Sequence, residues 1–98
     1  MGEGSQSEDD PQWSEAALVL GVAADELGSS DRRAFEDWLL HNEEGFAFEE
    51  LVQQAADASA PRAVWLRLAE AAELLKITVE TYPHEAAARV LARHLDVA

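Results

Sequence analysis

The stretch from residue 61 to residue 79 constrains this chain most, because no other window has so many apolar residues at helical spacing. Residues that recur every three or four positions line one side of an α-helix, and here they are Val64, Trp65, Leu68, Ala69, Ala72, Leu75 and Val79. Leu66, Leu74 and Ile77 fall on the other side, among charged residues. A helix that is apolar on two sides is either central in its own domain or covered by a partner.

The length and composition predict one helical domain with a short tail. The chain has 98 residues, of which 48% are hydrophobic, and this is enough for one core. We expect residues 1–10 to be a disordered acidic tail and residues 11–98 to form a single helical domain. Cysteine is absent, which excludes disulfides and thiolate chemistry and favours the cytoplasm. The sequence shows neither a leader peptide nor an apolar run of the roughly 18 residues that span a bilayer.

The negative charge is concentrated in the first part of the chain. Residues 1–60 have fifteen acidic and two basic side chains, whereas residues 61–98 have five of each, which together give the net charge of −13. Such a surface repels phosphate backbones, so the sequence argues against nucleic-acid binding. It attracts basic protein surfaces instead, although the same charge could serve only solubility.

Five helices are predicted, and the fold class is therefore an all-α, compact bundle. The predicted start and stop signals, in chain order, are Asp10 and Pro11, Gly28, Ser30, His41 and Asn42, Glu44 or Gly45, residues 57–60, Pro61 and Pro83. The stretch 77–82 has β-branched residues in near alternation but no second strand to pair with. We interpret it as the frayed end of the fourth helix.

No residue pattern in the sequence indicates catalysis, a cofactor or a metal. His41 and Glu44 have a spacing that metal ligands use on a helix, but a turn is predicted between them. The serines at 29 and 30 lack the strand and the second glycine of a nucleophile elbow. We therefore predict no catalytic, cofactor-binding or metal-binding residues, and we do not expect an enzyme.

Two groups of apolar residues bear on where the core and a binding surface lie. Trp13, Trp38 and Trp65 all fall on the inward sides and are predicted to be core. The second group falls on the predicted polar sides of the helices, and its residues either pack inside an irregular bundle or bind a partner: Leu18, Val22, Leu66, Leu74 and Ile77. We predict the latter.

The segment RAFEDWL at residues 33–39, followed by FEEL at 48–51, resembles the amino-terminal sigma-binding domain of FecR-type regulators. The glycines at 21 and 28 and the histidine at 41 are also similar to the wider anti-sigma-factor domain family. Because the positions that hold cysteines in its zinc-type branch are occupied here by Gly45 and its neighbours, the similarity is to the zinc-free branch. Over residues 13–58, the resemblance implies a small helical domain that sequesters a sigma factor.

Two other functions remain open from the sequence. The chain could be a homodimeric helical adaptor, in which the leftover apolar residues meet their own copies. It could also be an acyl-carrier-like protein with a serine of residues 29–30 as the attachment site, but the aspartate–serine–leucine signature is absent and Arg32 and Arg33 interrupt the acidic surface. The expected partner is another protein, such as a sigma factor, or a second copy of the chain.

Overall fold

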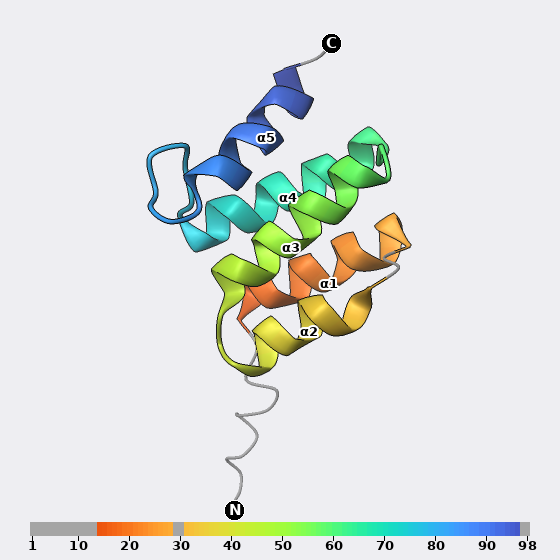
Figure 1. Cartoon of the computed structure of the whole chain (residues 1–98), viewed down its shortest axis with the longest axis vertical. Helices are drawn as coiled ribbons and strands as arrows, with labels where there is room; N and C mark the ends of the chain where they lie inside the picture. The colour runs from red at the N-terminus through yellow and green to blue at the C-terminus, as the bar shows by residue number, and fades with distance from the viewer. Residues whose placement is uncertain (1–13, 29–30, 97–98) are drawn as a thin grey trace, which may run out of the picture.

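The computed structural model describes residues 14–28 and 31–96, which form an all-α bundle of five helices without a strand in those ranges (Figure 1). The helices are α1 (Glu15–Leu27), α2 (Arg32–Leu40), α3 (Glu44–Asp57), α4 (Arg62–Leu75) and α5 (Glu85–Asp96). The predicted all-α fold is thus confirmed. The predicted tail, residues 1–10, lies outside the described residues.

The core lies where α3 and α4 meet the other helices. Helix α1 packs mainly on α4, α2 packs on α3, and α5 contacts both α3 and α4. The largest fully buried side chains come from four helices and are Phe35, Phe48, Leu20, Leu51, Leu68 and Val64. Each such side chain contributes roughly 1.5–3 kcal/mol by leaving water. The alanines of α1 and α4 keep those two helices close.

The first two helices begin at short polar side chains. The Oγ of Ser14 accepts a hydrogen bond from the backbone N–H of Ala17 at 3.2 Å, and the Oδ1 of Asp31 accepts one from that of Ala34 at 3.1 Å. These bonds satisfy amide groups that have no partner within the helix. The N-cap of α1 is therefore Ser14 and not the predicted Asp10, and the N-cap of α2 is Asp31 and not the predicted Ser30. Asp10, Pro11 and Ser30 lie outside the described residues.

A residue in the left-handed conformation follows each of the helices α1 to α4, directly after α1 and α4 and one position later after α2 and α3; these residues are Gly28, Asn42, Ser59 and Lys76. After α4, the N–H of Ile77 donates to the carbonyl of Ala72 at 2.9 Å, which is the long bond of a Schellman motif. Equivalent bonds follow α2, from Glu43 to Trp38, and α3, from Ala60 to Ala55. The predicted ends at Gly28 and at His41 and Asn42 are confirmed.

The prediction that residues 77–82 continue α4 is wrong, because α4 ends at Leu75. In a Schellman motif the residue after the left-handed one folds back on the helix, and this places Ile77 in the core with only 8% of its surface exposed. The chain then turns away, so that Val79, which was predicted to be core, is 41% exposed. Helix α5 begins at Glu85, after a cis peptide bond between Tyr82 and Pro83.

The tryptophans differ in their environment. Trp65 is buried as predicted, and its indole N–H donates to the carbonyl of Ala60 at 3.2 Å. Trp38 is 38% exposed, so its prediction as a core residue is wrong. It lies against Phe46, with 5.1 Å between ring centroids, near the surface where α2 meets α3. Trp13 lies outside the described residues.

Candidate partner-binding surface

Four of the five predicted partner-binding residues are large apolar side chains that face water. Leu18 and Val22 of α1 are 57% and 42% exposed, and Leu66 and Leu74 of α4 are 50% and 40% exposed. Two helix positions correspond to a rotation of about 200°, so Leu18 and Leu66 lie opposite the fully buried Leu20 and Leu68. The expected exposure of Ile77 is wrong, because the end of α4 turns it into the core.

Helices α1 and α4 pack against each other and run antiparallel (Figure 1). The guanidinium of Arg67, near the start of α4, lies 3.4 Å from the carboxylate of Glu26, near the end of α1. One turn further along each helix, Val22 and Glu70 line a shallow groove of about 190 Å³ between α1 and α4. We call the surface formed by Leu18, Val22, Leu66 and Leu74 the α1–α4 face.

Carboxylates surround the α1–α4 face. Glu15 lies one turn from Leu18 and Glu26 one turn from Val22 on α1, while on α4 Glu70 lies one turn from both leucines and Glu73 is next to Leu74. Arg67 is placed between Glu26 and Glu70, at 3.4 and 3.6 Å, so its charge is already shared by two acids. The face therefore combines an apolar centre with a negative border, which suits an apolar surface with a positive border.

The charged residues of this face were not predicted from the sequence. Glu26, Arg67 and Glu70 meet across two helices, and this contact was not expected. One signal was present: Glu70 is four residues from both Leu66 and Leu74, so the three must lie in one row on α4. The pairing of α1 with α4 carries no comparable signal, because it depends on the packing of the whole bundle.

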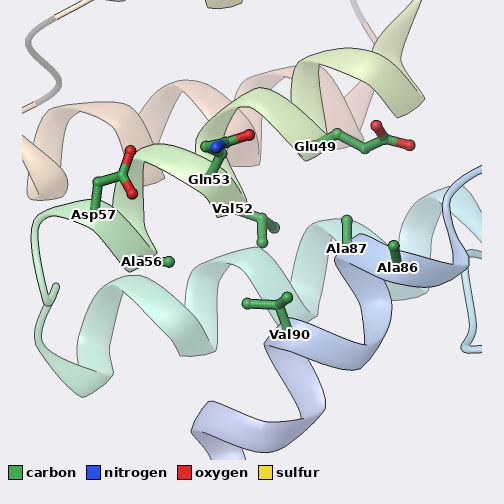
Figure 2. A pocket seen from close by; sticks show the side chains of 8 residues that line it. All are labelled: Glu49, Val52, Gln53, Ala56, Asp57, Ala86, Ala87 and Val90. Carbon is green, nitrogen blue, oxygen red and sulfur yellow. The ribbon is translucent and has the colours of Figure 1, made fainter.

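A second groove lies between α3 and α5 and has a volume of about 290 Å³. Figure 2 shows Val52 of α3 and Val90 of α5 pointing into it, while Glu49 and Asp57 lie toward its two ends. Gln53 and three small side chains, Ala56, Ala86 and Ala87, complete the lining. The groove is apolar and shallow, and it brings no pair of reactive groups together.

The histidines of the α5 region make structural contacts. The Nδ1 of His84 is hydrogen-bonded to the carboxylate of Glu49, and its ring packs edge-on against Phe46 with 4.9 Å between centroids. His94 stacks on Trp65, with a centroid distance of 3.9 Å and an interplanar angle of 7°. Together these contacts fasten both ends of α5 to α3 and α4.

The remaining candidates from the sequence do not form a site in the described residues. The Nδ1 of His41 lies 2.8 Å from the carbonyl oxygen of Asp37 in its own helix, at the predicted helix end. Within residues 14–28 and 31–96, no group of three or more histidine, aspartate and glutamate side chains is arranged to hold a metal ion. In the same ranges no helix has the length and apolar character that crossing a bilayer requires. Ser29 and Ser30 lie outside the described residues.

Comparison of the chain with protein families, with curated proteins and with solved structures found no match.

Proposed function

We propose that this chain is a non-catalytic protein-interaction module that binds another protein through the α1–α4 face. The observation that carries the proposal is the exposure of four large apolar side chains on two helices that pack against each other: Leu18, Val22, Leu66 and Leu74. Exposed apolar residues that gather on one face and have a polar border are typical of binding surfaces. Scattered single residues such as Leu40 need no such explanation.

The charge favours a basic partner over a second copy of the chain. A symmetric dimer through this face would bring two copies of the same carboxylates together, on chains that each have a net charge of −13. Like charges across an interface raise the free energy of the complex, whereas a basic surface on the partner lowers it. The homodimeric adaptor is therefore the second candidate, supported by the apolar residues alone.

Among basic protein partners, a sigma factor is the specific one that we propose to test first. The resemblance to FecR-type domains supports it, and the segments that carry that resemblance form α2 and part of α3. An anti-sigma-like regulator acts by sequestering a transcription factor, which requires binding and no catalysis. A cytoplasmic location belongs to the same proposal, since the chain has no cysteine and such a partner acts there.

The test is affinity purification with matched variants. The tagged chain, the double variant Leu66→Ser/Leu74→Ser and the control Leu40→Ser are expressed in the organism that encodes the protein. Leu40 is 69% exposed on α2, so the control removes an equally large apolar side chain outside the α1–α4 face. We expect one abundant protein to copurify with the wild-type chain and the control, and its recovery to fall about tenfold with the double variant.

The proposal is wrong if that protein copurifies equally with all three chains. Light scattering of the pure protein tests the second candidate: a mass that stays near 10.7 kDa at all concentrations excludes a homodimer. Mass spectrometry of the copurified protein shows whether it is a sigma factor. Recovery of a different protein by the same face would keep the interaction module and end the anti-sigma assignment.

A further inference from the structure

We infer that the α1–α4 face binds an amphipathic helix of its partner, with apolar and basic residues alternating turn by turn. This inference rests on the proposed function and deepens it. The apolar residues of the face form two short rows, Leu18 with Val22 on α1 and Leu66 with Leu74 on α4. The shallow groove between the two helices is lined by Val19 and Val22 on one side and by Arg67 and Glu70 on the other. An amphipathic helix commonly binds in a groove between two other helices.

The dimensions of the face fit one helix. Leu66 and Leu74 are eight residues apart, which is about 12 Å along α4 or a little over two turns. A helix of about three to four turns covers that length, whereas the interface between two globular domains needs about 800 Å² from each partner. Addition of an extended strand requires a free sheet edge, and the described residues form no sheet.

The order of charges along α4 sets the register of the bound helix. Leu66, Glu70 and Leu74 form a row with a carboxylate between two leucines. A helix that lies along this row therefore needs an apolar, a basic and an apolar residue at successive turns. Glu70 is available to such a residue because its contact with Arg67, at 3.6 Å, joins two half-exposed side chains. Exposed pairs of this kind contribute at most about 1 kcal/mol.

The remaining charges favour the same occupant. Glu15 and Glu73 lie toward one end of the antiparallel rows and Glu26 toward the other, so both ends of a bound helix would meet carboxylates. Basic residues at both ends of the helix would pair with them, and an acidic helix would be repelled. Since such interactions are screened by salt, the affinity should fall as ionic strength rises.

The test uses two labelled peptides of about 18 residues, long enough for five helical turns. The first repeats leucine and lysine so that leucine, lysine and leucine recur at four-residue intervals on one face. The second has glutamate in place of each lysine. Binding to the full chain is measured by fluorescence anisotropy at low and at high salt. The protein variants are Leu66→Ser/Leu74→Ser, Glu70→Gln and the control Leu40→Ser, with circular dichroism to confirm that each is folded.

We expect the lysine peptide to bind the wild-type chain and the Leu40→Ser control equally. The double variant should bind it about tenfold more weakly, because two apolar contacts are lost. Glu70→Gln should weaken binding by about two- to fivefold, as expected for one exposed charge pair. The glutamate peptide should not bind.

Three results would overturn the inference: no binding of the lysine peptide, equal binding of both peptides, or equal binding of the lysine peptide to the double variant and the control. The proposed function fails separately, when the copurified partner is retained by the double variant. If the partner is lost with the double variant but the lysine peptide does not bind, the interaction module stands and the helical ligand is wrong.

Discussion

Replacing Gly45 by alanine should destabilise the protein, although alanine is the better helix former. Gly45 lies in the first turn of α3, where glycine costs up to about 1 kcal/mol relative to alanine. A Cβ atom at this position would lie 2.8 Å from Cε1 and 2.9 Å from Cδ2 of His84, and closer still to Nε2. No real Cβ tolerates such distances, so the imidazole must move.

The magnitude follows from what His84 would lose. Its hydrogen bond to Glu49 is partly shielded from water, because the two side chains are 14% and 31% exposed, and contributes about 1–2 kcal/mol. Its edge-on contact with Phe46 contributes about 0.5–1.5 kcal/mol. After subtraction of the gain in helix propensity, we expect Gly45→Ala to lower the free energy of unfolding by about 1–2 kcal/mol.

Urea unfolding, followed by tryptophan fluorescence and by circular dichroism, measures this change. In a His84→Ala background the obstacle is gone, and Gly45→Ala should then stabilise the protein by about 0.5–1 kcal/mol. The sign of the effect thus reverses between the two backgrounds. If Gly45→Ala stabilises both to the same extent, the packing of His84 against α3 does not restrict this position.

Two further changes test the ends of α4 and α5. His94→Ala removes the ring stacked on Trp65 and should lower the free energy of unfolding by about 1 kcal/mol. His94→Phe keeps a stacked ring and should lower the free energy of unfolding by less. Equal losses for the two variants in urea unfolding would contradict a stabilising stack. Lys76 has φ of 60°, so Lys76→Gly should raise the free energy of unfolding by about 0.5–1 kcal/mol and the β-branched Lys76→Val should lower it. A thermal unfolding midpoint that changes in the same direction for both variants would contradict the left-handed end of α4.

The helices themselves were predictable from local patterns. The start of the third helix was predicted at Glu44 or Gly45, and α3 begins at Glu44, because such start signals depend on the order of neighbouring residues alone. Gly28 and Asn42 marked helix ends, since these residue types tolerate the left-handed conformation best. Ser59 and Lys76 adopt the same conformation with no such signal. This is why the end of α4 was misplaced and Ile77 was expected on the surface.

The candidate site was predictable only in part. Leu18, Val22, Leu66 and Leu74 stood out because each falls on the polar side of an apolar helix, a property of one helix at a time. Which of these residues become neighbours depends on how helices pack, and contacts between residues far apart in sequence leave no periodic pattern.

The amino-acid sequence by itself determined that this protein is helical, where most of its helices begin and end, and which of their sides are apolar, because these properties depend on neighbours within a few residues. The tertiary structure alone decided that α1 and α4 lie antiparallel, that Arg67 is held between Glu26 and Glu70, and that His84 fastens α5 to α3. Those contacts join residues up to dozens of positions apart, and only the packing of all five helices around one core selects them.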